Sequence, residues 1–135
     1  MTQASSLDPR FEEILAACRQ YLDGLHHSDT ARLRQVFHPA ALYACASEGR
    51  LTHMTMEAYF PMVDRRPSPA SRNESRAGER IVSIEFAGPV TAFVRLECSI
   101  AEKAFTDLLT FVHLDGRWQI IAKVFHFEIT PAAAS

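Results

Sequence analysis

Asp107 and His126, in the last third of the sequence, carry a carboxylate and an imidazole, and both groups can give or take protons. A carboxylate whose pKa is raised by desolvation can act as a general base and remove a proton next to a carbonyl group. A histidine beside it can polarise or protonate the same substrate, because its pKa lies near neutral pH. This chemistry requires that both side chains project from the same face of the structure that carries them.

The dipeptide Asp115-Gly116 separates two alternating apolar runs, which predicts a β-hairpin with a two-residue turn. Directly opposed residues share a face, so this register places an acid and an imidazole among apolar neighbours. The predicted apolar face holds Trp118, Ile120, Val124, Phe111, Leu109, Phe105, Asp107 and His126. The predicted polar face holds Thr106, Thr110, Gln119, Lys123 and Phe125, joined by Arg95 and Glu97 from the preceding strand. A one-residue β-bulge would move Asp107 or His126 to the opposite face.

The pairing of Asp107 with His126 allows two interpretations. Either the two side chains, or Asp107 with a buried hydroxyl, form a purely structural contact, since a buried carboxylate must find a partner. Or they form the polar floor of a ligand pocket. The sequence favours neither interpretation over the other.

Five further residues are candidates for ligand binding. The apolar residues Trp118 and Phe111 would line a cavity suited to a flat or ring-shaped molecule. Tyr43 and Tyr59 would present hydroxyl groups to it, or else lie in the core with those groups bonded to backbone or water. His38 precedes Pro39 and either contacts the ligand or stabilises the end of a helix.

Composition excludes several classes of protein. The chain has 135 residues, 47% of them hydrophobic and 22% charged, which is typical of one globular domain. Fourteen Lys and Arg face 16 Asp and Glu, a net charge of -2 without a basic stripe, so we expect no nucleic-acid partner. The three cysteines match no zinc or redox spacing, so we expect no metal, no cofactor and a reducing, cytoplasmic setting. No signal peptide or membrane span is expected, and hence no membrane partner.

The order of elements predicts an α+β fold in a single domain, 1–135, with an ordered core over about 8–130. Helical spacing predicts a helix that starts at Asp8-Pro9, a short second helix that Pro39 ends, and a third from Thr55 that Pro61 kinks or shortens. A long loop is expected at 65–78. Strands are expected at 41–46, 80–86, 90–101, 104–114 and 117–129.

The ordered set of motifs resembles the NTF2-like superfamily, and within it the SnoaL-like and putative lumazine-binding branch. The resemblance lies in "FHPAALY" after a helical pair, then in Phe105–Leu109, Asp115–Trp118 and Lys123–His126, and it spans about 11–128. It implies a cone in which a curved, mostly antiparallel sheet wraps around three N-terminal helices and encloses a cavity. It also implies a homodimer formed through the outer face of the sheet.

Three functions remain open, because this scaffold hosts enzymes as well as binding domains. The first is a binding domain for a small apolar or ring-shaped molecule, with Asp107 and His126 as the polar floor of its cavity. The second is an isomerase, cyclase or dehydratase that uses Asp107 as general base and His126 as its partner. The third is a dimeric interaction domain.

Overall fold

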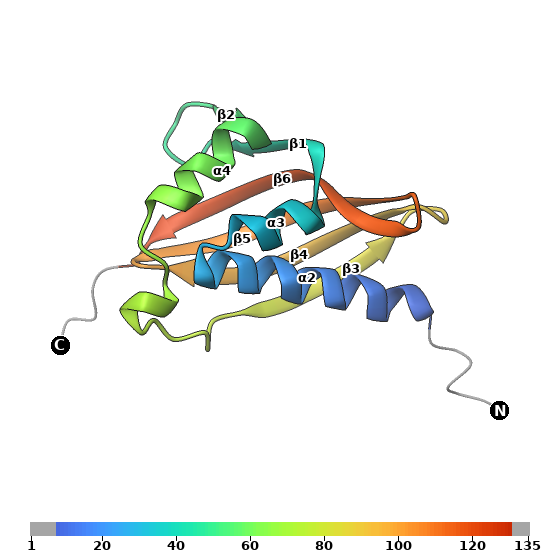
Figure 1. Ribbon diagram of the computed structural model, residues 1–135, viewed down its shortest axis with the longest axis horizontal. Coiled ribbons are helices and arrows are strands. Elements are labelled where there is room, and N and C mark those ends of the chain that lie inside the picture. The colour runs from blue at the N-terminus through green and yellow to red at the C-terminus, as the bar shows by residue number, and fades with distance from the viewer. Residues whose placement is uncertain (1–7, 131–135) are drawn as a thin grey trace.

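The computed structural model describes residues 8–130 and contains three α-helices over that range (Figure 1). The helices are α2 (Pro9–His27), α3 (Thr30–Val36) and α4 (Met56–Arg65), followed by a 3-10 turn, η1 (Ala70–Arg72). The strands are β1 (Phe37–Cys45), β2 (Thr52–Thr55), β3 (Arg80–Phe86), β4 (Thr91–Ile100), β5 (Lys103–Leu114) and β6 (Arg117–Ile129). None of the helices in the described range is long and apolar enough to cross a membrane.

Helix α2 begins as the sequence predicts. The Asp8 side chain accepts a hydrogen bond from the Arg10 backbone amide at 2.9 Å, and Pro9 occupies the first helical position, where no amide hydrogen is needed. The helix ends at His27, and the backbone amide of the next residue, Ser28, which is left-handed, donates hydrogen bonds to the carbonyl groups of Gly24 and Leu25. Gly24 has a packing role, since a Cβ atom there would lie 2.6 Å from a methyl carbon of Leu33 on α3.

The strands form one six-stranded sheet in the order β2-β1-β6-β5-β4-β3. The pair β1 and β6 is parallel, and every other neighbouring pair is antiparallel. The Asp115-Gly116 hairpin forms as predicted, with His113 opposite Trp118. The fold is thus α+β, with a curved sheet that does not close on itself.

Three details differ from the sequence prediction. Helix α3 ends at Val36 and strand β1 starts at Phe37, so Pro39 lies inside an irregular stretch of strand instead of ending the helix. Strand β2 pairs with β1 but was not expected, because its four residues, Thr52–Thr55, show little alternation. Helix α4 continues past Pro61 to Arg65, and the exposed position of that proline keeps its ring clear of the core.

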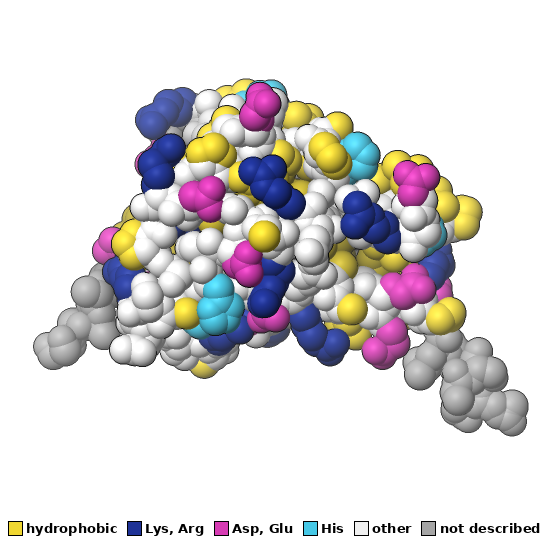
Figure 2. Space-filling model, viewed as in Figure 1, with side chains coloured by type: hydrophobic (Ala, Val, Ile, Leu, Met, Phe, Trp, Pro, Cys, Tyr) yellow, Lys and Arg dark blue, Asp and Glu magenta, His cyan; other side chains and the backbone are white. Residues whose placement is uncertain are grey.

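The helices cover one face of the sheet and the core lies between the two layers (Figure 1). Large side chains from both layers are fully buried there, among them Tyr21 of α2, Phe37 of β1, Tyr59 of α4 and Phe111 of β5. On the helical face of the molecule, basic and acidic side chains are intermixed, with no basic stripe (Figure 2). A ligand inside the cone would contact the side chains on the inner face of the sheet.

Candidate functional site

A β-bulge in β6 decides which of its side chains enter the cone. Phe111 pairs with Ile120, but Thr110 pairs with Ala122, so Ile121 is one extra residue on β6. Beyond this point the alternation is reversed. Lys123 and Phe125 point inward and are 5% and 7% exposed, whereas Val124 and His126 face outward.

The prediction that His126 shares the inner face with Asp107 is wrong, and the bulge is the physical reason. The His126 side chain is 58% exposed on the outer face. Its Nδ1 lies 2.7 Å from the Ser47 hydroxyl, and its Nε2 lies 3.3 Å from the Glu128 carboxylate. The Ser47 hydroxyl also accepts a hydrogen bond from the Phe127 amide at 3.0 Å, so this group fastens the end of β1 to β6.

Asp107 lies inside the cone, 1% exposed, as the register of β4 and β5 predicted. Its partner is a buried hydroxyl: the Tyr21 hydroxyl on α2 donates to Oδ2 at 2.5 Å. Burial, and then the charge of Asp107, raise the pKa of Tyr21 well above its ordinary value, so the tyrosine keeps its proton. The second oxygen, Oδ1, is buried and has no hydrogen-bond partner among the described residues.

Lys123 brings a second charge to the same interior. Its Nζ donates to the Tyr59 hydroxyl at 3.4 Å and lies 5.2 to 5.5 Å from the ring centroids of Tyr21, Tyr43, Tyr59 and Phe125. Burial alone would lower the pKa of Lys123, but Tyr59 and Asp107 outweigh it, so the pKa is raised and the side chain carries an ammonium group at neutral pH. A carboxylate and an ammonium group thus lie in the same water-poor interior.

These charges line a small inner chamber of about 20 Å³, bounded by Tyr43, Tyr59, Arg66, Cys98, Asp107 and Lys123 among others. That volume accommodates about one water-sized group. Burial raises the pKa of the Cys98 thiol to about 12, so this cysteine is not a thiolate nucleophile at neutral pH.

The inner chamber adjoins a larger outer cavity of about 450 Å³. The two spaces share Tyr43, Arg66, Ile100 and Phe105 as lining residues. The outer cavity is bounded by the end of α4, the β4–β5 turn and parts of β1, β2 and β6, and most of its surface is apolar. A ligand that fills it could place one small group in the inner chamber.

The other predicted binding residues divide into two groups. Tyr43 and Tyr59 line the inner chamber. Phe111 is fully buried in the core, and His38 uses its Nδ1 to accept a hydrogen bond from the exposed Ala40 amide, so neither borders the two cavities. Trp118 lines a separate groove, where its indole donates to Glu13 at 2.9 Å. The expected contact of Trp118, Phe111 and His38 with a ligand in the cone is therefore not supported by their positions.

Three residues of the site were missed by the sequence reasoning. Tyr21 lies on the buried face of α2, at helical spacing from Cys18 and Leu25, and that signal was available. Lys123 was placed on the outer face because strict alternation was assumed, although the run Ile120-Ile121-Ala122 interrupts it. Arg66 carried no signal, because it lies in the stretch expected to be a loop.

No group of three or more His, Cys, Asp or Glu side chains within residues 8–130 is placed to hold a metal ion. The polar groups that line the inner chamber are a carboxylate, an ammonium group, a guanidinium group, a thiol and phenolic hydroxyls. These groups can move a proton and stabilise negative charge on an oxygen.

Comparison with known proteins agrees with this architecture. The family model described as "Putative lumazine-binding" matches residues 9–126. A curated relative, "Aldolase FrzH" from Cladobotryum sp, is 25% identical over 118 residues, which cover 86% of this chain and 90% of that protein.

Solved structures show the same fold. An NTF-2 like protein of unknown function from Silicibacter pomeroyi superposes with a TM-score of 0.77 at 23% identity, covering 94% of this chain and all (100%) of the other. An NTF2-like protein of unknown function from Shewanella baltica gives a TM-score of 0.77 at 19% identity, covering 96% and 99%. A cystatin-like fold protein from Burkholderia xenovorans gives 0.62 at 16% identity, covering 89% and 92%.

Proposed function

The chain belongs to the "Putative lumazine-binding" family of NTF2-like proteins, and on that premise we propose that it binds a small carbonyl compound and catalyses proton transfer at the carbon next to the carbonyl group. One observation carries the proposal: a buried aspartate with one unpartnered oxygen and a buried lysine line the same small chamber behind an apolar cavity. This arrangement matches the charges that develop when a carbonyl compound loses an α-proton.

Asp107 is the proposed base. The hydrogen bond from Tyr21 to Oδ2 fixes the orientation of the carboxylate and leaves Oδ1 free to accept a proton. The α-carbon would lose its proton to Oδ1, and its electron pair would move toward the carbonyl oxygen to give an enolate.

Lys123 is the proposed stabiliser of the enolate oxygen, together with the Tyr59 hydroxyl. A fixed positive charge in a water-poor site stabilises a developing oxyanion more than it would in water. Because the raised pKa keeps Lys123 protonated, the amine has no free electron pair with which to form a Schiff base. We therefore propose acid–base chemistry without a covalent lysine adduct.

The enolate would then take the proton back from Asp107 at carbon, as in an isomerisation. Alternatively it would attack a second carbonyl carbon, whose oxygen would take that proton, as in an aldol reaction. The curated relative named an aldolase supports the second course. In either case the carbonyl oxygen occupies the inner chamber, the α-carbon lies at its opening, and the apolar body stays in the outer cavity.

The first test is hydrogen–deuterium exchange at the α-carbon of cyclohexanone and acetophenone in heavy water, measured by NMR. The second assay is the retro-aldol cleavage of a fluorogenic naphthyl β-hydroxyketone. The wild-type protein should accelerate exchange, and Asp107→Asn should reduce the rate by about 10²-fold or more. His126→Gln is the matched control, because its imidazole lies on the outer face and its loss should leave the rate unchanged. Equal rates for wild type and Asp107→Asn would refute the proposal.

A binding domain without turnover is the second candidate, favoured by the small volume of the inner chamber compared with the outer cavity. It predicts that ketones bind to the wild-type protein and to Asp107→Asn alike, with no exchange above that of buffer. Borohydride treatment in the presence of cyclohexanone tests for Schiff-base chemistry, which would leave an alkylated Lys123 detectable by mass spectrometry. Both candidate functions predict that Lys123 stays unmodified.

We further propose that two copies pair through the outer face of the sheet, as an interaction domain would. Partly exposed apolar side chains on four strands support this: Leu42, Val82, Phe93 and Val124, with exposures of 38% to 49%. Val124 projects from the outer face, where the sequence predicts Lys123 and Phe125 instead. Sedimentation should give the mass of a dimer for the wild-type protein and that of a monomer for Val124→Lys; a wild-type monomer at all concentrations would exclude pairing.

A reducing, cytoplasmic setting is part of the same proposal. The three cysteines, Cys18, Cys45 and Cys98, are buried as free thiols. Thiol titration of the denatured protein purified without reductant should find all three free. A disulfide in that material would contradict the assignment.

A further inference from the structure

We infer that Arg66 is a carboxylate-binding residue between the inner chamber and the outer cavity, so that the site takes an apolar carbonyl compound that bears a carboxylate group. The inference rests on the proposed function in treating the two spaces as one ligand site. It adds the chemical class of the ligand and the residue that selects it.

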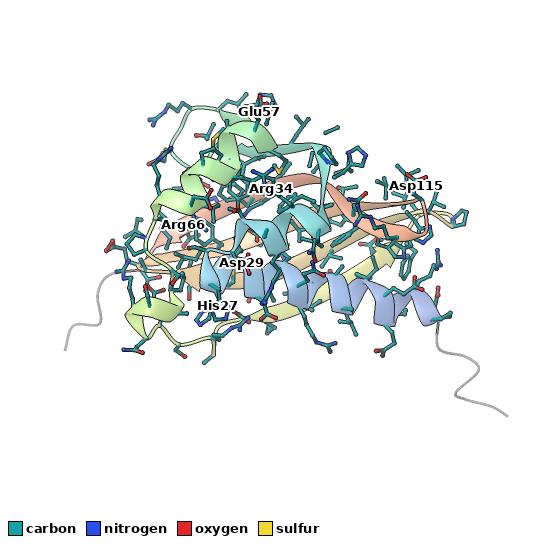
Figure 3. The ribbon with its side chains drawn as sticks, in the orientation of Figure 1. His27, Asp29, Arg34, Glu57, Arg66 and Asp115 are labelled. Atoms are coloured by element: carbon teal, nitrogen blue, oxygen red, sulfur yellow. The ribbon has the colours of Figure 1, made fainter. Side chains whose placement is uncertain are left out.

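The first observation is that the Arg66 guanidinium has unused donors. It follows the last turn of α4, over the end of the sheet (Figure 3). Its Nε and Nη2 atoms are buried, and neither has a hydrogen-bond partner among the described residues. Buried charged donors without an acceptor are costly, and guanidinium stays charged at any relevant pH. An acceptor supplied by a ligand would satisfy both atoms.

The second observation is the position of Arg66. It is one of the few residues that border both the inner chamber and the outer cavity. A ligand group bound to it would lie at the boundary of the inner chamber, which Asp107 and Lys123 also line. Arg66 could therefore orient a substrate whose carbonyl group enters that chamber.

The third observation is the balance of charge. The inner chamber is lined by two cations, Lys123 and Arg66, and by one anion, Asp107, which leaves one positive charge in excess. At the rim of the outer cavity the charges cancel, with Arg72 and Lys103 against Glu48 and Glu102. One negative charge on a ligand bound beside Arg66 would neutralise this excess.

A single excess charge favours a carboxylate over a phosphate, which carries closer to two charges near neutral pH. The planar fork of a guanidinium also matches a carboxylate in a paired hydrogen bond. Apolar side chains in the outer cavity, including Met54, Met62, Phe125 and Phe127, fit the hydrocarbon part of the ligand.

The experiment uses hydrocinnamate as an unreactive probe and its amide as a neutral molecule of the same shape, with calorimetric titration of the full chain. Hydrocinnamate should bind the wild-type protein about tenfold to a hundredfold more tightly than the amide does, as a charged hydrogen bond would give. Arg66→Gln should remove this difference, and Arg66→Lys should retain part of it. Arg65→Gln, the exposed neighbour on α4, is the matched control and should bind as the wild type does.

Thermal unfolding tests whether Arg66→Gln loses binding only because the protein is destabilised. Because Arg66→Gln removes a partly buried cation with two unpartnered donor atoms, Tm should stay the same or rise. A lower Tm together with lost binding would count against the inference. Equal affinity of acid and amide for the wild-type protein would overturn it. Tighter binding of phenethylphosphonate or inorganic phosphate than of hydrocinnamate would overturn the choice of carboxylate.

The Asp107→Asn variant separates this inference from the proposed catalysis. It should lose α-proton exchange and still bind hydrocinnamate at least as well as the wild type, because a negative charge has been removed from the chamber. Ketone exchange without a preference for the acid would defeat the inference alone. A preference for the acid without exchange in the wild type would defeat the catalytic proposal alone.

Discussion

The β5–β6 hairpin has two halves that differ in what they present to the interior. Between the Asp115-Gly116 turn and the bulge, the inward side chains include Phe111 and Ile120, both fully buried and apolar. Beyond the bulge, the same two strands present Asp107 and Lys123, which are buried to a similar degree but charged. The first half is part of the core and the second half forms the wall of a polar chamber.

One extra residue thus separates the apolar half of the hairpin, which belongs to the core, from the charged half, which lines the chamber. Without Ile121 as an extra residue, strict alternation along β6 would send Lys123 to solvent and His126 into the cone. With it, a charged residue enters the chamber opposite α2, where the Tyr21 hydroxyl and the Tyr59 hydroxyl meet the two charges.

The largest expected effect follows from reversing the charge that the bulge brings inside. Lys123→Glu would bury a second carboxylate near Asp107, so the free energy of unfolding should fall by more than about 4 kcal/mol, or the protein should fail to fold. His126→Glu adds a carboxylate beside Glu128 on the solvent-exposed outer face, so it should lower the free energy of unfolding by no more than about 1 kcal/mol. Urea denaturation of both variants measures the difference, and similar values for the two would contradict the assigned faces.

The apolar half should respond to lost volume. Phe111→Ala leaves a cavity in close-packed surroundings, and the free energy of unfolding should fall by about 3–5 kcal/mol in urea denaturation. Because Phe111 does not border the chamber, the rate of ketone exchange per folded molecule should be unchanged. Loss of ketone exchange in folded Phe111→Ala protein would contradict the claim that the apolar half of the hairpin takes no part in the chemistry.

Alkaline pH should lower the free energy of unfolding through the buried titratable groups around the chamber. Burial raises the pKa of Cys98 from 9.0 to about 12, and the pKa values of Tyr21 and Lys123 are raised as well. A group whose pKa rises on folding holds its proton longer in the folded state, so its stabilising contribution is complete below the unfolded pKa and is lost as the pH rises toward the folded one. For Cys98 the free energy of unfolding should fall by about 1.4 kcal/mol per pH unit above pH 9.

Urea denaturation at a series of alkaline pH values measures this slope. Cys98→Ala removes one of the titrating groups, so its curve should be flatter than that of the wild type above pH 9. A stability that rises with pH in that range would show that these groups are not protected by burial.

A smaller effect on stability is expected for Asp107→Asn. The asparagine oxygen can still accept the hydrogen bond from Tyr21, but Lys123 loses the nearby negative charge, so the free energy of unfolding should fall by about 1–2 kcal/mol. A loss no larger than this, together with lost ketone exchange, would show a carboxylate that serves chemistry instead of folding. A large loss of stability would show the opposite.

Much of the fold could be predicted because local signals agree with the final packing. Asp8-Pro9 starts α2, Asp115-Gly116 forms the hairpin turn, and alternation along β4 and β5 places Asp107 inside. These features depend on residues close together in sequence, so period and turn chemistry are sufficient to find them.

The site could be predicted only in part, because it depends on contacts between distant elements. The partner of Asp107 is 86 residues away on α2, and Arg66 reaches the cavity only once α4 lies against the sheet. The direction of Lys123 depends on a bulge, and an apolar run such as Ile120-Ile121-Ala122 does not reveal which of its residues is the extra one.

The side of the sheet to which Lys123 projects is the central claim, and the chain is well suited to testing it because its two lysines are Lys103 and Lys123. Acetic anhydride labelling of the folded protein, read by peptide mass spectrometry, compares them directly. Exposed Lys103 should be acetylated rapidly, whereas Lys123, at 5% exposure, should react only after denaturation. Acetylation of both lysines at similar rates in the folded protein would contradict the account.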